Sequence, residues 1–422
     1  MSVLPPTGTS KTLPLEYAQA LTRQVPGSSR VQSLDVFRGI TMAGMILVNN
    51  PGDGLHVYPP LEHSAWEGCT PTDLVFPFFL FIVGVAIPFS LASRRAKLAA
   101  RGLGARQQNR AIVLNSIRRA AVLFGLGLVL YAFPINLHRP PGSGASGMGI
   151  LDPATVRIPG VLQRIALCYL AASLLTMFSG WRTRAGVAAT LLVGYVLLMR
   201  LVPVPGFGHD VLTADGSLAS YLDRLLLGRH TYRPNYDPEG LLCTLPAIVT
   251  AIIGTFAGQW LCTSRVPSEK AAAMMAFGVI GAVLGYVTDG PLLPINKALW
   301  TPSFEIYTGG LALLGFGLCY WIIDVQGRSR WATPFTILGM NAIGTYVLSG
   351  LLGRLTLLIK VTGEGKPVYL KNWLYDHLLA PMTHGSLNAS PYVASMLWGL
   401  AYVLLLLGVA TWMYRRRIFL KV

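Results

Sequence analysis

Residues 70–90 read TPTDLVFPFFLFIVGVAIPFS, and this stretch decides what kind of protein the chain is. Between Asp73 and Arg94 there is no charged residue, and nearly every side chain is apolar or small. A run of about 20 such residues is long enough to cross the hydrocarbon core of a bilayer as a helix. Backbone groups in lipid must be hydrogen-bonded internally, so a helix is the expected form. The stretch therefore predicts a transmembrane helix over 73–93.

The same pattern recurs along the chain of 422 residues. Hydrophobic residues make up 53% of it and charged residues 12%, whereas soluble domains carry about 25% charged residues. The expected fold is an all-α polytopic membrane protein with about 10 transmembrane helices. The predicted spans are 35–51, 73–93, 114–133, 159–178, 183–202, 241–262, 271–288, 304–324, 334–357 and 391–414.

The net charge of +16 is distributed unevenly over the loops. The loops on one side, together with both tails and the adjoining span ends (Arg38 included), hold 22 of the 34 Lys and Arg but only four of the 18 Asp and Glu. An excess of Lys and Arg is typical of cytoplasmic loops. Both termini are therefore expected in the cytoplasm, with the loop between the first two spans outside. The charge reports membrane topology and does not indicate a nucleic-acid partner.

One membrane domain is predicted over 31–422, preceded by a polar cytoplasmic tail at 1–30. The tail has no continuous apolar core and does not resemble a cleaved signal peptide. Two short helices are expected along the membrane surface in the outer loops, at 218–227 and 369–380. The five cysteines form no CxxC pair, so neither a metal site nor a disulfide framework is expected.

The polar loop between the first two spans carries the main candidate for chemistry, His63, within LEHSAWEGC (61–69). A neutral imidazole can take a proton from an amine or hydroxyl. It can also attack an acyl donor directly and carry the acyl group. The alternative is a loop histidine without a role, because all seven histidines fall outside in the predicted topology.

Two polar residues flank this loop at the span ends. Asp73 begins the second span, where it either orients the imidazole or only caps the helix. Asn49 ends the first span, where its amide either donates to a carbonyl oxygen or belongs to a plain helix exit. A histidine, a carboxylate and an amide at a membrane face can together form a proton-transfer site.

Polar residues within the spans are costly in lipid and usually face a cavity or a partner. Asp35 and Arg38 lie three residues apart, on one face of the first span. Arg164 lies near the start of the fourth span, where it faces a cavity or pairs with Glu305 of the eighth span. Asn341 lies in the ninth span, within GMNAIGTY.

Two further outer loops combine polar and aromatic residues, NYDPEG at 235–240 and PINKALW at 294–300. Asp237, Glu239, Asn296 and Trp300 are predicted to hold a polar, sugar-like substrate, and Trp66 beside the histidine joins this set. Turn-forming and capping roles explain the Asp-Pro and Asn residues equally well.

In this order and spacing, several segments together resemble the heparan-α-glucosaminide N-acetyltransferase family of transmembrane acetyltransferases. They are SLDVFRGI, VNNPGD, HSAWEGCTPTDLVFPFFLFIVG, VRIPGVLQRIALCYL, LDRLLLG, YDPEGLL, PINKALW and TPFTILGMNAI. The resemblance runs from about residue 31 to the C-terminus, and the chain resembles a bacterial member. Lysosomal members carry a large N-terminal luminal domain and one more leading span, and in their place only a short cytoplasmic tail is expected here.

The resemblance implies transfer of an acetyl group from cytoplasmic acetyl-CoA to a glucosamine-type amino sugar on the other side of the membrane. It implies His63 as the catalytic residue, with Asp73 and Asn49 beside it. Acetyl-CoA serves as co-substrate without a metal. Its expected contacts are Arg38, Arg119, Arg164 and Asn341, since Arg can clamp phosphates. The basic loop at 94–119 has an alternative role in topology and in contact with anionic lipid.

A bacterial inner-membrane location, contact with membrane lipids and a homodimer follow from the same resemblance. The acceptor in a bacterial envelope is expected to be an amino sugar of a cell-surface saccharide, and not heparan itself. The alternative function is a membrane transporter for amino sugars or their derivatives, because polar residues inside spans also fit a substrate path.

Overall fold

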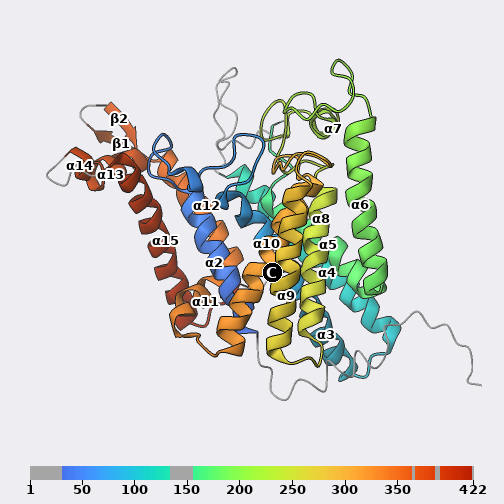
Figure 1. The fold of residues 1–422 in the computed structure, drawn as a ribbon. Helices are drawn as coiled ribbons and strands as arrows, with labels where there is room; N and C mark the ends of the chain where they lie inside the picture. The colour runs from blue at the N-terminus through green and yellow to red at the C-terminus, as the bar shows by residue number, and fades with distance from the viewer. Residues whose placement is uncertain (1–30, 134–154, 364–365, 385–389, 421–422) are drawn as a thin grey trace, which may run out of the picture.

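The computed structural model describes residues 31–133, 155–363, 366–384 and 390–420, and its ordered elements are almost all helices (Figure 1). The long helices are α2 (Gln32–Asn49), α3 (Val75–Ala99), α4 (Ala105–Ala132), α5 (Val161–Phe178), α6 (Trp181–Leu201), α8 (Thr244–Leu261), α9 (Pro267–Val287), α10 (Pro302–Tyr320), α12 (Ala342–Leu358) and α15 (Pro391–Arg415). Shorter elements are η1 (Pro59–Leu61), η2 (Pro71–Leu74), α7 (Leu218–Leu227), η3 (Trp321–Val325), η4 (Arg330–Ala332), α11 (Thr333–Met340), α13 (Leu370–Leu378) and α14 (Pro381–His384). A two-stranded antiparallel hairpin, β1 (Lys360–Gly363) with β2 (Lys366–Tyr369), completes the described chain.

The predicted all-α membrane fold is confirmed. Eight described helices are long and apolar enough to cross a membrane, and the pair 330–340 and 342–358, bent by 71°, forms a ninth candidate. The helix α2 is 18 residues long and lies where the first span is predicted, but it is not among these candidates. Together these helices occupy all ten predicted positions, while the count of ten spans stays a prediction.

Glycines allow three helix pairs to approach closely. A Cβ at Gly84 of α3 would lie 2.1 Å from the Ala251 carbonyl oxygen of α8, and a Cβ at Gly310 of α10 would lie 2.2 Å from the Ala282 nitrogen of α9. A Cβ at Gly39 of α2 would overlap the Phe335 carbonyl oxygen of α11. Small residues at such crossings give helices in lipid their van der Waals contact. The close contacts hold α2 against α11 and α3 against α8, and α2 and α3 flank the polar loop.

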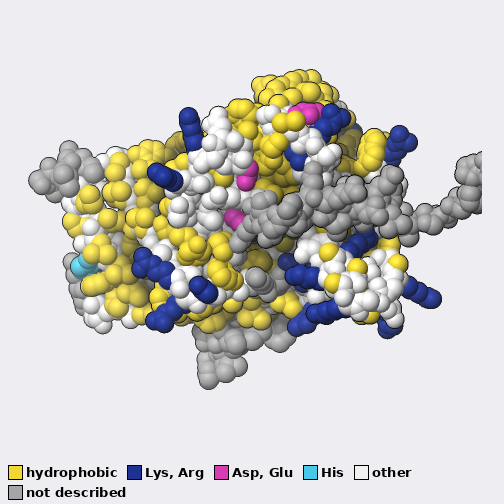
Figure 2. Space-filling model, turned by 90° about the horizontal axis from the view of Figure 1, so that it is seen from below, with side chains coloured by type: hydrophobic (Ala, Val, Ile, Leu, Met, Phe, Trp, Pro, Cys, Tyr) yellow, Lys and Arg dark blue, Asp and Glu magenta, His cyan; other side chains and the backbone are white. Residues whose placement is uncertain are grey.

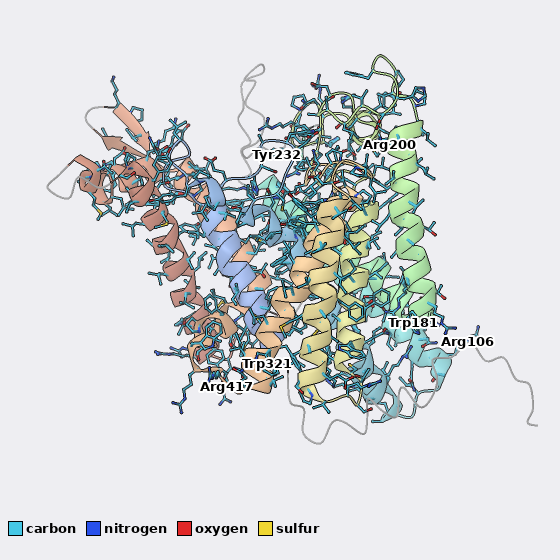
Figure 3. The ribbon with its side chains drawn as sticks, in the orientation of Figure 1. Arg106, Trp181, Arg200, Tyr232, Trp321 and Arg417 are labelled. Atoms are coloured by element: carbon cyan, nitrogen blue, oxygen red, sulfur yellow. The ribbon has the colours of Figure 1, made fainter. Side chains whose placement is uncertain are left out.

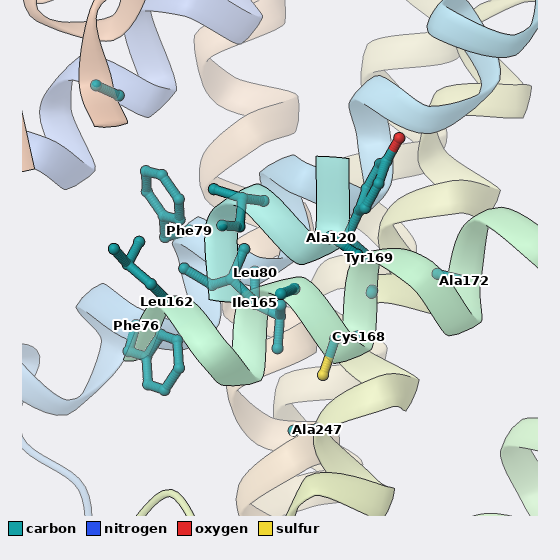
Figure 4. Packing of buried hydrophobic residues seen from close by; sticks show 14 of the residues in the cluster. Phe76, Phe79, Leu80, Ala120, Leu162, Ile165, Cys168, Tyr169, Ala172 and Ala247 are labelled. Atoms are coloured by element: carbon teal, nitrogen blue, oxygen red, sulfur yellow. The ribbon is translucent and has the colours of Figure 1, made fainter. Parts of the chain in front are cut away.

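A continuous apolar core lies among α3, α4, α5 and α8, as Figure 4 shows. Phe79 and Leu80 of α3 pack near Leu162 and Ile165 of α5, and Ala247 of α8 belongs to the same cluster. These side chains leave little space for solvent, so the helices form a firm support beneath the loops at one end of the bundle.

The two ends of the bundle differ in chemistry. The upper end carries the loops of 50–70, 203–240 and 288–301 with α7, and Tyr232 and Arg200 mark it in Figure 3. The lower end, marked by Arg106 and Arg417, shows many Lys and Arg side chains and few acidic ones (Figure 2). The short helices predicted at 218–227 and 369–380 are present as α7 and α13. The predicted tail 1–30 and most of the loop 134–158 lie outside the described residues.

Candidate active site

The start of α3 is shaped by a capping interaction that also positions a carboxylate. Thr70 precedes η2, and its backbone nitrogen and its hydroxyl both donate to Oδ2 of Asp73, at 3.0 and 3.1 Å. Ser64 donates its backbone nitrogen to the same oxygen at 3.1 Å. The sequence left two roles open for Asp73, and the helix-capping role is present in the structure.

The other carboxylate oxygen faces the histidine. Nδ1 of His63 lies 2.7 Å from Oδ1 of Asp73. The Asp73 side chain is fully buried, whereas 54% of the His63 side chain is exposed. One carboxylate thus caps α3 with Oδ2 and orients an accessible imidazole with Oδ1. The contact leaves Nε2 without a hydrogen-bond partner among the described residues, in the position required of a general base.

A third side chain reaches this pair from a distant part of the sequence. Nζ of Lys297 lies 3.1 Å from Oδ1 of Asp73 and 3.0 Å from Nδ1 of His63. Lys297 stands in the PINKALW segment, where the sequence singled out Asn296 and Trp300 but not the lysine between them. Sequence reasoning could connect Lys297 with the site only through its place in this segment, because His63 and Asp73, which it contacts, are more than 220 positions away.

Contacts with two other loops hold the histidine loop in place. The indole nitrogen of Trp66 donates to the Leu212 carbonyl oxygen at 2.9 Å, and its ring meets Tyr236 edge to face, with centroids 5.4 Å apart. The backbone nitrogen of Gly68 donates to the Ile295 carbonyl oxygen at 2.7 Å. Trp66 is half-buried, so one part of its ring supports the loop and the rest faces solvent near His63.

The YDPEG turn carries the second charged cluster of the upper end. Arg157 donates to both carboxylate oxygens of Asp237, at 2.8 and 2.5 Å, and also to Glu239 and to the hydroxyl of Tyr131. Burial opposes the charge of Arg157, but the carboxylates of Glu239 and Asp237 outweigh it and raise the pKa of the guanidinium. Burial likewise opposes the charge of Glu239, and Arg157 with Arg164 holds its pKa below the usual value. Arg157, which sequence reasoning did not single out, is therefore the central cation of this cluster.

Three residues predicted to bind ligands are buried in the fold. Trp300 and Asn296 are buried, and Nε1 of Trp300 donates to Oε2 of Glu305 at 2.9 Å. The Arg164 guanidinium lies over the Trp300 ring, 4.9 Å from its centroid, and donates to Sγ of Cys243 at 2.9 Å. No ion pair joins Arg164 to Glu305 among the described residues, so Trp300 separates the two side chains that the sequence offered as partners.

Asn49 lines a cavity of about 250 Å³ between α2, α4, α12, α13 and α15. Its other polar lining residues include Tyr131, Tyr346, Arg354 and Lys371. A buried Nη1 of Arg354 has no hydrogen-bond partner among the described residues. Burial lowers the pKa of Lys371. His63 is not among the lining residues, and no hydrogen bond joins Asn49 to His63 or Asp73 in the part of the chain that the structure describes.

The remaining predicted cofactor contacts lie toward the lower end. Arg38 donates to Asp35 of its own helix at 3.4 Å, and Arg119 to the hydroxyl of Tyr169 at 3.4 Å. Asn341, at the bend between α11 and α12, donates to the Ile418 carbonyl oxygen at 3.1 Å and accepts from the Leu420 nitrogen at 3.1 Å. Asn341 thereby ties the C-terminal segment to the bend, a structural role that the sequence did not predict.

The cysteine at the end of the histidine loop has the surroundings of a neutral thiol. Burial raises the pKa of the Cys69 thiol to about 12, and the Asp73 charge adds to the effect. A thiol with such a pKa is not ionised near neutral pH. Among the ranges that the structure describes, no group of three or more His, Cys, Asp and Glu residues is placed to hold a metal ion.

The fold and this site describe a multi-pass membrane protein with an accessible imidazole at one face. The sequence profile described as "Heparan-alpha-glucosaminide N-acetyltransferase, catalytic" matches residues 30–288, and the chain belongs to this family. It is 31% identical to the heparan-alpha-glucosaminide N-acetyltransferases of Mus musculus and Homo sapiens, over 76% and 75% of this chain. The alignments cover 53% of the mouse and 52% of the human protein, so the chain spans about half the length of these relatives. The matched range includes His63 and Asp73 but not Lys297.

Proposed function

We propose that the protein is a transmembrane acetyltransferase that moves an acetyl group from acetyl-CoA to a glucosamine-type amino sugar. The observation that carries the proposal is the His63–Asp73 pair at the upper end, in a chain of an N-acetyltransferase family. An imidazole whose Nδ1 faces a buried carboxylate and whose Nε2 is accessible is the arrangement that general-base acyl transfer needs.

In the proposed reaction the acceptor amine attacks the carbonyl carbon of the thioester, and the carbon–sulfur bond breaks. Nε2 of His63 takes the proton from the attacking nitrogen and returns it to the leaving thiolate. Asp73 holds the ring in the tautomer that carries its hydrogen on Nδ1, at 2.7 Å from Oδ1. General acid–base help of this kind contributes about 10²–10⁴-fold to the rate. An acyl-histidine route would use the same nitrogen as the nucleophile.

The cavity lined by Asn49 is proposed to receive the acyl end of the donor. Its volume of about 250 Å³ lies just below the usual range for whole ligands, roughly 300–1,000 Å³. It therefore fits the thioester end of the coenzyme better than the whole molecule. Arg354 and Lys371 supply positive charge on its wall, and the amide of Asn49 is available to a carbonyl oxygen. Arg38, Arg119, Arg164 and Asn341 stay proposed coenzyme contacts.

The acceptor is proposed to bind at the loops beside His63. Trp66 is half-exposed next to the histidine, and Glu239 with Asp237 forms a charged wall nearby. Lys297 interacts electrostatically with Glu239 as well as with Asp73, so the two clusters are adjacent. Asn296 and Trp300 are buried, and their proposed contribution is to hold the PINKALW segment that presents Lys297.

The proposed orientation places the lower end in the cytoplasm of a bacterial cell, within the inner membrane. The excess of Lys and Arg at that end supports it (Figure 2). Acetyl-CoA is a cytoplasmic metabolite in this arrangement, while His63 meets the acceptor at the outer face.

Reconstitution in liposomes tests the function. Vesicles with acetyl-CoA on one side and glucosamine on the other are assayed for N-acetylglucosamine, with His63→Ala as the inactive control. Acetylated product that depends on His63 supports the proposal. Glucosamine uptake that needs no acetyl-CoA would overturn it in favour of a transporter.

A further inference from the structure

The His63 ring is bordered on the same side by a carboxylate and an ammonium group. Oδ1 of Asp73 accepts hydrogen bonds from Nζ of Lys297 at 3.1 Å and from Nδ1 of His63 at 2.7 Å. Nζ and Nδ1 lie 3.0 Å apart. Only 20% of the Lys297 side chain is exposed and none of the Asp73 side chain. The interaction is therefore screened by water less than a surface ion pair would be.

The contact distances show which ring nitrogen of His63 carries a hydrogen. The 2.7 Å contact of Nδ1 with a carboxylate oxygen requires a hydrogen on Nδ1, because two lone pairs at that distance repel. Nδ1 then has no lone pair for Lys297, whose ammonium donates to Oδ1 instead. The ammonium group faces Nδ1, which carries the single N–H hydrogen of the neutral ring. A second proton, on Nε2, would place a positive ring next to a positive ammonium group.

We propose that Lys297 is a positioning residue that shares the charge of Asp73 with the His63 ring, holding the ring in its neutral Nδ1–H form with Nε2 free. Without Lys297 the carboxylate would have, among the described side chains, His63 as its one counter-charge and would favour the imidazolium. With Lys297 present, Asp73 still orients the ring, and the ammonium group offsets the tendency of the carboxylate to favour a protonated, positively charged ring. This role rests on the proposed function, in which Nε2 acts as the base.

The charges around the ring are consistent with this balance. Asp73 and Lys297 contact it directly, and Cys69, which interacts with both, is a neutral thiol. Behind Lys297, the carboxylate of Glu239 is paired with Arg157 and near Arg164. The Glu239 charge is thus compensated by Arg157 and Arg164, and within the described ranges Lys297 is the cation in direct contact with the His63–Asp73 pair.

The first test compares the pH dependence of kcat/KM for the full-length reconstituted protein and two variants. Lys297→Met should move the acidic limb of the profile to higher pH by about one to three units, the range for unit charges about 4 Å apart between bulk water and an effective dielectric constant of about 20. On the alkaline side of the limb, its activity should stay within about tenfold of wild type. Lys297→Arg keeps the charge, and its limb should stay within about half a unit. The matched control is Lys366→Met, at an exposed lysine of the β-hairpin, which should leave the profile unchanged.

The second test does not depend on turnover. Diethyl pyrocarbonate modifies neutral imidazole, and mass spectrometry of the peptide containing residue 63 follows the extent of modification against pH. Lys297→Met should move the midpoint of this curve to higher pH by the same amount as the kinetic limb, and Lys297→Arg should not. A Lys297→Gln variant, which is close in size and polar, serves the same purpose if the methionine variant does not fold.

The two tests separate the possible failures. If no acetyl transfer occurs but the modification curve moves in Lys297→Met, the proposed function fails and the role of Lys297 stands. If transfer depends on His63 but neither the limb nor the modification midpoint moves, the role of Lys297 is overturned and the proposed function stands.

Discussion

The loop between α2 and α3 contains two histidine–aspartate pairs, and their surroundings differ. In the first, Nδ1 of His63 lies 2.7 Å from the fully buried Asp73, whose other oxygen accepts three hydrogen bonds. In the second, Nδ1 of His56 lies 2.5 Å from Oδ2 of Asp53, three positions away in sequence, and 31% of the Asp53 side chain is exposed. Distance alone would favour the second pair.

The difference lies in what fixes the carboxylate. Asp73 is held by the helix cap, by Ser64 and by Lys297 from another part of the chain, so the ring it orients has one defined direction. Asp53 accepts from His56 and from the Leu55 nitrogen within one local turn, and these contacts lower its pKa. A precise catalytic geometry needs support from surrounding residues. For the second pair that support reaches the Asp53 backbone, through Ser395 of α15, and the His56 ring, through Tyr392, but among the described residues the Asp53 carboxylate itself accepts hydrogen bonds only from His56 and Leu55.

The largest expected effect separates the two histidines. His63→Ala should lower kcat by about 10²–10⁴-fold, the range for loss of a general base. His56→Ala should stay within a few-fold of wild type in the same acetyl-transfer assay. Equal losses in both variants, at matched protein yield and thermal stability, would contradict the assignment of the base to His63.

The next effect separates the two roles of Asp73. Asp73→Asn keeps an oxygen acceptor for the helix cap but loses the charge that orients the ring and pairs with Lys297, so kcat should fall by about 10²-fold or more. Asp73→Ala should lose the same activity and also about 1 kcal/mol of stability from the cap. If Asp73→Asn retained full activity in the pH range of the wild-type plateau, Asp73 would be a cap only.

A third carboxylate of the upper end, that of Asp223, is expected to make the stability of the protein depend on pH. Asp223 of α7 is buried and accepts a hydrogen bond from the Leu241 nitrogen, but no ion pair to it is present in the described chain. Burial raises its pKa to about 7. Because the folded-state pKa lies above the unfolded value, its contribution to stability is complete below about pH 4 and is lost as the pH rises through 7.

Wild type should therefore lose several degrees of Tm between pH 5 and pH 8 that Asp223→Asn does not lose. Thermal unfolding of the two proteins in the same detergent measures the difference. The Asp53→Asn variant is the control, because the wild-type Asp53 carboxylate has a lowered pKa and is already ionised between pH 5 and pH 8. Parallel Tm profiles for wild type and Asp223→Asn would rule out the buried carboxylate as the cause.

The smallest expected effect concerns the second histidine–aspartate pair. The folded-state pKa of Asp53 lies below the ordinary value of 3.8. The stabilisation by Asp53 is therefore present above pH 3.8 and is lost as the pH falls through the folded-state pKa. Asp53→Asn should cost less than about 1 kcal/mol at pH 6, as for other exposed pairs. The Tm values of wild type and variant should converge in acid, and a gap that widened there would contradict the pairing.

Much of the helical layout was predictable from the sequence, whereas many side-chain contacts were not. Apolar runs of bilayer length predicted the positions of the long helices, and the spacing at 218–227 predicted α7 with the observed bounds. The proximity of His63 and Asp73 was also predictable, because ten residues of one loop separate them. By contrast, Asn296 and Trp300 were predicted as substrate contacts, yet both are buried within the fold.

The class of fold, the uneven charge of the two ends and the family could all be predicted from the sequence, because they depend on composition, periodicity and short motifs. Which charged groups meet depends on how the helices pack. Lys297 reaches Asp73 across 224 positions, and Arg157 reaches Asp237 across 80. Such contacts depend on how α3, α8, α9 and α10 pack, and close packing at glycines such as Gly84 and Gly310 sets that arrangement. The balance of charge around His63 is for this reason a property of the folded chain and not of any one segment.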